Sequence, residues 1–291
     1  MAAMAWTITD DVHEFLAAAG DWLRTSTAEN TLMLTVAEAC RLGSAPAPAD
    51  VPEAFGWWTD EHGLVVGACM QTPPFPLLIS ATPPGAPAAL AARLADAAHP
   101  PSQLSGDQPA VEAFGREWLA LHPGATSEVA WRQRLYRLGA LAWPSAPGEA
   151  RPATAADRDL LVAWREAFQA DIGERNHSDT ARAVDSVLSY GGWTLWTVDG
   201  APVSMCSLTR QVAGMVRVGA VYTPPEHRRH GYAAAVVATV SQRAREAGAT
   251  EIVLFTDLDN PTSNSVYQRI GYRPVRDSIV LELVPSSDHR M

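Results

Sequence analysis

One loop constrains the fold of this chain more than any other segment. It joins an apolar run typical of a buried strand, residues 215–222, to a long helical pattern over residues 232–247. The loop ends in the sequence R-R-H-G at residues 228–231. A helix N-terminus offers unpaired N–H groups and partial positive charge, and a glycine without a Cβ lets a ligand approach the backbone. A strand that enters a helix through such a loop predicts an anion-binding site.

A second motif follows further along the chain. An apolar run at 251–256, typical of a strand, leads into a helical segment in which Asn260, Asn264 and Tyr267 follow the pattern N-x-x-x-N-x-x-Y. The segment closes with I-G-Y at residues 270–272. The two motifs together are far more specific than either one alone.

These motifs resemble the GNAT superfamily of acetyl-CoA-dependent N-acyltransferases. The resemblance rests on R-x-x-G-x-A at 228–233, on N-x-x-x-N-x-x-Y at 260–267 and on the closing I-G-Y, and the order of strands and helices agrees over 150–284. It implies acetyl-CoA as cosubstrate, without a metal. It also implies an α/β (α+β) fold, with a mixed, mainly antiparallel sheet whose splayed central strand is flanked by helices.

The resemblance implies a cofactor role for two groups of residues. The backbone at the end of the splayed strand would bind the pantetheine arm, and the loop at 228–234 would hold the pyrophosphate. Asn260 would meet the pantetheine or the acyl end, and Asn264 would support it. The predicted cofactor-binding residues are Val221, Tyr222, Thr223, Arg228, Arg229, His230, Gly231, Tyr232, Ala233, Ala234, Asn260 and Asn264.

Tyr267 is the predicted catalytic residue. By the same resemblance it would stand near the thioester sulfur and protonate the departing CoA thiolate. A phenol with a pKa of about 10 gives its proton to a thiolate whose thiol has a pKa near 8.5 only if the site positions and tunes the pair. The alternative interpretation is an aromatic side chain that packs its helix against the sheet.

The expected reaction is direct attack of a primary amine on the acyl thioester, with a backbone N–H near Val221 as oxyanion donor. Many family members carry a Glu on the strand before the loop, whereas residues 215–220 read M-V-R-V-G-A and contain no carboxylate. The base therefore stays open between a water chain and the side chains of Asp257, Asp259 and Glu174.

The chain is long enough for two domains of about 140 residues each. A proline-rich stretch at 143–152 separates halves with the same order of expected elements, and T-P-P precedes the corresponding helix in each half, at 82–84 and 223–225. We interpret this as a diverged tandem duplication. It would give a degenerate GNAT-like domain without the cofactor motif at 1–143 and a catalytic, acetyl-CoA-binding GNAT domain at 148–291.

Composition excludes several classes of function. The net charge of −10 argues against general affinity for nucleic acid or an anionic membrane surface. No stretch approaches the ~18 uninterrupted apolar residues of a membrane-spanning helix, and the first ten residues show no secretory signal. The three cysteines are widely spaced and form no metal-binding pattern, so we expect a cytoplasmic protein without a metal.

The sequence therefore predicts an N-acetyltransferase that transfers an acetyl group from acetyl-CoA to the primary amine of a small molecule. The alternatives are a protein or peptide N-acetyltransferase and a non-catalytic acyl-CoA-binding sensor or scaffold. Trp164, Phe168, Asp171 and residues 174–177 would line the acceptor side and suit a small cation with an apolar body, although an ordinary amphipathic helix fits the same pattern. The oligomeric state, monomer or homodimer, is open.

Overall fold

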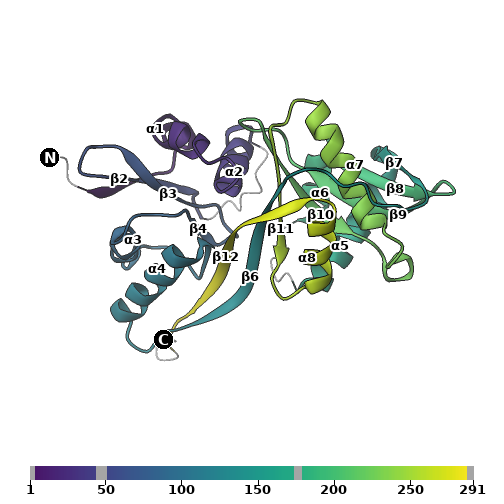
Figure 1. The fold of residues 1–291 in the computed structure, drawn as a ribbon. Helices are drawn as coiled ribbons and strands as arrows, with labels where there is room; N and C mark the ends of the chain where they lie inside the picture. Colours follow the sequence, from purple (N-terminus) through teal and green to yellow (C-terminus); the bar gives the residue numbers. More distant parts are fainter. Residues whose placement is uncertain (1–3, 44–50, 174–178, 287–291) are drawn as a thin grey trace. The chain divides into compact units, whose positions relative to one another are not determined.

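A computed structural model describes residues 4–43, 51–173 and 179–286 (Figure 1). The chain forms two compact units. Unit 1 comprises Met1–Ser26, Leu32–Gln133 and Asp277–Met291, and unit 2 comprises Thr27–Thr31 and Arg134–Arg276. Within the described ranges, no helix is both long and apolar enough to cross a membrane.

Unit 1 is a sheet covered by helices. Its strands follow the order β1-β2-β3-β4-β5-β12, in which β4 and β5 are parallel and the other pairs are antiparallel. Phe15, Phe55, Leu90 and Phe114 are fully buried in it. The elements that precede β6 are β1 (Ala5–Thr9), α1 (Val12–Arg24), α2 (Thr31–Arg41), β2 (Ala54–Thr59), β3 (Val65–Gln71), β4 (Leu77–Ile79), α3 (Ala86–Leu94), β5 (Gln103–Asp107) and α4 (Gln108–Leu121).

Unit 2 has the strand order β6-β11-β10-β9-β8-β7. In it β10 and β11 are parallel, whereas β7, β8, β9 and β10 pair antiparallel in succession. Helix α7 packs on β8, β9 and β10. The elements are β7 (Glu149–Pro152), η1 (Ala155–Asp157), α5 (Arg158–Asp171), α6 (Thr180–Leu188), β8 (Trp193–Val198), β9 (Ala201–Leu208), β10 (Met215–Tyr222), η2 (Pro225–His227), α7 (Tyr232–Glu246), β11 (Glu251–Asp257) and α8 (Pro261–Arg269).

The order of elements repeats along the chain. The first half runs β1-α1-α2-β2-β3-β4-α3-β5-α4-β6, and the second half runs β7-α5-α6-β8-β9-β10-α7-β11-α8-β12, apart from two short 3-10 turns. In each half a parallel pair connects the strands on either side of the third helix, β4 with β5 and β10 with β11. This repetition agrees with the tandem duplication that the sequence indicates.

The last strand of each half joins the sheet of the other half. Residues Ser278–Glu282 of β12 (Tyr272–Val284) pair antiparallel with β5 in unit 1. Conversely, β6 (Thr126–Leu138) lies next to β11, and its last five residues belong to unit 2. The proposed domains at 1–143 and 148–291 therefore have different edges from the compact units.

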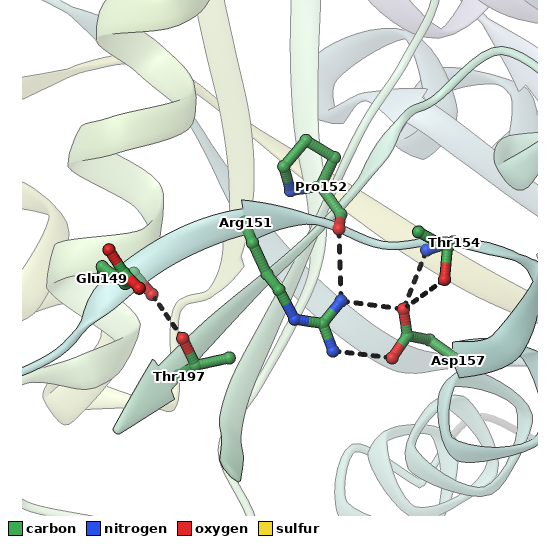
Figure 2. Close-up of polar contacts among 6 residues, drawn as sticks. All are labelled: Glu149, Arg151, Pro152, Thr154, Asp157 and Thr197. Atoms are coloured by element: carbon green, nitrogen blue, oxygen red, sulfur yellow. Dashed lines mark hydrogen bonds and ion pairs between the residues drawn. The ribbon is translucent and has the colours of Figure 1, made fainter. Parts of the chain in front are cut away.

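The predicted linker at 143–152 ends in a strand. Glu149–Pro152 form β7 on the edge of the unit 2 sheet, paired with β8. Arg151 on this strand forms a bidentate ion pair with Asp157, with Nη2 2.7 Å from Oδ1. The Asp157 carboxylate also accepts a 2.8 Å bond from the backbone N–H of Thr154, which forms part of a capping box at the start of η1 (Figure 2). The proline-rich sequence thus stops at the edge strand rather than running into a free linker.

Candidate functional site

The strands β10 and β11 separate at the carboxyl end of their parallel pair. Their register joins Met215–Val218 to Glu251–Leu254. Beyond Val218, the pairing of β10 with β9 shifts between Gly219 and Tyr222, and Ala220 takes a left-handed φ of 44°. A bulge of this kind bends its strand and re-aims the following backbone groups. The backbone of Val221, Tyr222 and Thr223 lies on this splayed end.

A buried hydroxyl fixes the bulge from the neighbouring strand. Ser204 on β9 is fully buried, and its Oγ donates a 2.9 Å hydrogen bond to the carbonyl oxygen of Tyr222. The same Oγ lies 2.9 Å from Oγ1 of Thr223. Ser204 was not among the residues predicted from the sequence, in which its signal is a polar residue inside an apolar strand.

The loop after β10 leads to the N-terminus of α7 without a side-chain cap. Arg229 and Gly231 have positive φ values of 68° and 83°, and Gly231 is the N-cap residue. No side chain within the described ranges caps this helix, so the N–H groups of its first turn keep their hydrogen-bonding capacity. A Cβ at Gly231 would lie 3.4 Å from the carbonyl oxygen of Ser145, an ordinary van der Waals contact, so the positive φ rather than crowding favours glycine at this position.

Side chains of the predicted pyrophosphate loop lie in three environments. Arg228 turns back toward the sheet, with Nη2 2.5 Å from Oδ2 of Asp171 and Nε 3.0 Å from the carbonyl oxygen of Thr223. Arg229 is exposed, as is His230, whose ring stacks on Tyr232 with centroids 5.3 Å apart. Side chains of the first helical turn face the core or its edge; these are Tyr232, Ala233 and Ala234.

The two predicted asparagines hold helix α8 in place. Asn260 is its N-cap, and Oδ1 of this residue accepts a 3.0 Å bond from the backbone N–H of Ser263. Asn264 donates from Nδ2 to the carbonyl oxygens of Asp257 and Asn260, both at 2.8 Å. These bonds tie the start of α8 to the end of β11, beside the splayed strands.

Tyr267 lies on α8 with only 9% of its surface exposed. Its ring contacts the edge of Tyr272 at a centroid distance of 6.2 Å. Burial, and secondarily the nearby Cys206, raises the pKa of Tyr267 well above the usual value of a phenol, so the side chain is neutral at physiological pH. Among the residues that the structure describes, none forms a hydrogen bond with its hydroxyl.

A comparison with protein families gives a match within the second half of the chain. Residues 156–272 match the model of the Acetyltransferase (GNAT) family. This half of the chain belongs to the GNAT superfamily. N-acetyltransferase 8 of Mus musculus is 29% identical in an alignment of 119 positions, which covers 36% of this chain and 49% of the relative. The chain therefore spans about half the length of that curated relative.

Solved structures extend the likeness to both halves. A Drosophila protein of known structure covers 98% of this chain and 100% of its own, with a TM-score of 0.64 at 12% identity. A GCN5-related N-acetyltransferase from Sphaerobacter thermophilus covers 97% of both chains, with a TM-score of 0.60 at 16% identity. Together with the repeated order of elements, these likenesses confirm the predicted fold class, an α/β chain of two tandem GNAT-like domains.

The residues predicted to line the acceptor side lie on α5 and after it. Trp164 lies 6.2 Å from Tyr222 between ring centroids, and the guanidinium of Arg165 lies 5.3 Å from the ring of Phe168. Asp171 is the last residue of this helix and forms an ion pair with Arg228. The predicted residues 174–177, Glu174 among them, lie outside the described residues. Of the other candidate bases, Asp257 accepts a 2.8 Å bond from the N–H of Asp259.

The loop before α3 in the first half lacks the features of the loop at 228–231 that precedes α7. Helix α3 also begins after a left-handed glycine, Gly85 with φ 89°, but Pro87 removes an N–H group from its first turn. Residues 82–87 read T-P-P-G-A-P and contain no arginine. The hydroxyl of Thr82 is buried without a hydrogen-bond partner among the described residues, whereas Thr223 reaches Ser204. Among the described residues, no cluster of three or more His, Cys, Asp or Glu side chains has metal-binding geometry.

Proposed function

We propose that unit 2 transfers an acetyl group from acetyl-CoA to the primary amine of a small molecule. The observation that carries the proposal is the separation of β10 from β11 after Val218, beside an uncapped helix N-terminus that follows a left-handed glycine. An open strand edge offers hydrogen bonds to an extended pantetheine arm, and the helix N-terminus offers N–H groups to a pyrophosphate. We assign Arg229 to the pyrophosphate because its exposed side chain forms no ion pair among the described residues, whereas Arg228 is paired with Asp171.

The reaction follows from this placement of acetyl-CoA. A backbone N–H near Val221 donates a hydrogen bond to the thioester oxygen, on which negative charge develops while the neutral amine attacks the carbonyl carbon. The C–S bond then breaks, the CoA thiolate takes the proton of Tyr267, and the amine loses its proton to water or to a nearby carboxylate. Burial disfavours a thiolate as it disfavours a phenolate, so a buried thiolate binds the proton more tightly than one in water does.

The acceptor class rests on α5. Aromatic side chains beside Asp171 suit a small amine with an apolar body. A chain with a net charge of −10 does not repel a basic peptide, so an enzyme that acetylates a protein or peptide is the second candidate. Because the three free cysteines are dispersed along the chain, we assign the protein to a reducing compartment, the cytoplasm.

A second candidate function is an acyl-CoA sensor or scaffold without turnover. It is favoured by β10, which carries Arg217 and no carboxylate. Burial lowers the pKa of Arg217 to about 10, yet the side chain is still a cation at neutral pH, and its Nη1 donates to the hydroxyl of Thr31 at 3.3 Å. This strand therefore supplies no side-chain base for the amine.

Thiol release from acetyl-CoA with a panel of primary amines tests the proposal. We expect amine-dependent release, and we expect Tyr267→Phe to slow it by about 10²- to 10⁴-fold, as the loss of a general acid does. The matched control is Tyr190→Phe, which removes the hydroxyl of a partly buried phenol in unit 2 that bonds the carbonyl oxygen of Leu208. An unchanged rate in Tyr267→Phe would remove the acid role. Acetyl-CoA binding without thiol release, whatever the amine, would favour the sensor.

A further inference from the structure

A fully buried tyrosine from the first half of the sequence lies at the centre of a polar network under α8. Tyr136 on β6 has no exposed surface. Its hydroxyl donates a 2.9 Å bond to Oδ1 of Asn264 and accepts a 3.0 Å bond from Nε2 of Gln268. Both partners lie on α8, four residues apart, and therefore on one face of that helix.

The network leaves α8 little freedom to turn about its axis. Asn264 uses its acceptor for Tyr136 and its Nδ2 for the carbonyl oxygens of Asp257 and Asn260. Tyr136 thus holds the same amide that ties α8 to the end of β11. Tyr136 is buried, whereas Asn264 is half-buried and Gln268 is exposed. The hydroxyl of Tyr136 therefore depends on these two side chains for its hydrogen bonds, and its bonds to both restrain α8 on this face.

The position of Tyr267 depends on this network. Tyr267 lies between Asn264 and Gln268 in the sequence of α8, so any rotation that the network prevents would also move the Tyr267 hydroxyl. The ring of Tyr267 contacts the ring of Tyr272. The Tyr272 hydroxyl lies 2.8 Å from Oγ of Ser241 on α7. Misplacing a reacting group by 1 Å can cost about 10²-fold in rate.

We infer that Tyr136 is a positioning residue for the acid Tyr267, acting through Asn264 and Gln268. The inference rests on the proposed function of unit 2. It gives β6 a specific role in that function, because this strand carries into the GNAT sheet the one hydroxyl that bridges the two α8 side chains.

A double-mutant cycle on the rate of thiol release from acetyl-CoA tests the inference. Tyr136→Phe keeps the ring and removes both bonds, and we expect kcat to fall by about 10- to 100-fold with little change in KM for acetyl-CoA. In the Tyr267→Phe background the same substitution should have no further effect, because the group that it positions is already gone. Gln268→Met removes one bond only and should give a smaller loss of kcat.

The outcomes separate a positioning role from a purely structural one. Tyr190→Phe serves as control and should leave kcat unchanged, since the Tyr190 hydroxyl bonds Leu208 rather than α8. If the effects of Tyr136→Phe and Tyr267→Phe multiply in the double variant, or if only KM rises, the inference is wrong although the proposed function stands. If Tyr136→Phe does not fold, Gln268→Met in both backgrounds decides by the same criterion. A wild-type protein that releases no thiol with any amine overturns the proposed function and the inference with it.

Discussion

At the scale of single residues, pairs of polar side chains connect neighbouring elements of the GNAT half. Arg151 and Asp157 connect the edge strand β7 to the start of α5 with two hydrogen bonds (Figure 2). The Arg151 guanidinium, together with the N–H and hydroxyl of Thr154, holds the pKa of the Asp157 carboxyl well below its usual range. The carboxylate is largely shielded from water, so the pair is less screened than an ordinary surface ion pair.

This pKa shift predicts a pH-dependent contribution to stability. A carboxyl whose pKa is lower in the folded state stabilises the fold above its unfolded pKa of about 4, and this contribution is lost as the pH falls toward the folded pKa. Asp157→Asn should therefore lower the free energy of unfolding by about 1–3 kcal/mol at pH 7. Urea titrations at pH 7 and pH 3 check this. The difference in the free energy of unfolding between wild type and variant should be smaller at pH 3 than at pH 7. An equal gap at both values would show that the charge of Asp157 contributes nothing.

At the scale of elements, the sequence predicts those strands, turns and helices whose formation depends on residues close to one another in the chain. The turn at 199–200, the strands at 193–198 and 215–222, and the helix after Gly231 lie where their sequence patterns indicate, because apolar periodicity and turn glycines act over a few residues. The segment 11–43 has helical spacing in its apolar residues, and it forms two helices, α1 and α2, with turns between Arg24 and Thr31. Strands β1 and β5 and helix α6 were missed, since each is short and gains its stability from its neighbours.

The bulge of β10 gives the prediction at this scale. Ser204→Ala removes the donor to the Tyr222 carbonyl, and the buried carbonyl then loses its partner. We expect weaker binding of acetyl-CoA, by about tenfold for each 1.4 kcal/mol lost from the ordered strand end, and a lower free energy of unfolding. Calorimetric titration with acetyl-CoA measures the first effect.

The control for Ser204→Ala is a buried serine of unit 1. Ser80 donates a 2.9 Å bond from Oγ to the carbonyl oxygen of Ala81 and accepts one from the N–H of Ala68. Ser80→Ala should lower stability and leave acetyl-CoA affinity as it is. Equal affinities in wild type, Ser204→Ala and Ser80→Ala would show that the bulge does not order the cofactor site.

At the scale of the whole molecule, the exchange of last strands makes each unit depend on the other half of the sequence. Unit 2 needs residues 134–138 of β6, and unit 1 needs residues 277–284 of β12. The sequence repeat predicted the duplication but not the exchange, because strand pairing over such separations leaves no local pattern. For the same reason Tyr136 and Ser204 were not predicted: their partners Asn264 and Tyr222 are distant in sequence.

The exchange predicts the behaviour of fragments. A fragment of residues 148–291 lacks β6, so the edge of β11 and the Asn264 network lose their partners. We expect it to be unstable or aggregated. A fragment that starts at residue 130 and keeps residues 130–138 of β6 should be better folded, as judged by circular dichroism and urea unfolding. Equal stability of the two fragments would contradict the dependence on β6.

The central claim, one acetyl-CoA site per chain at the start of α7, is tested most directly by calorimetric titration of the full chain with acetyl-CoA. The account predicts one site per chain. Arg229→Glu should abolish binding, whereas the same charge change at the exposed Arg93 of α3 should leave it intact. Two sites per chain, or binding that survives Arg229→Glu unchanged, would contradict the account.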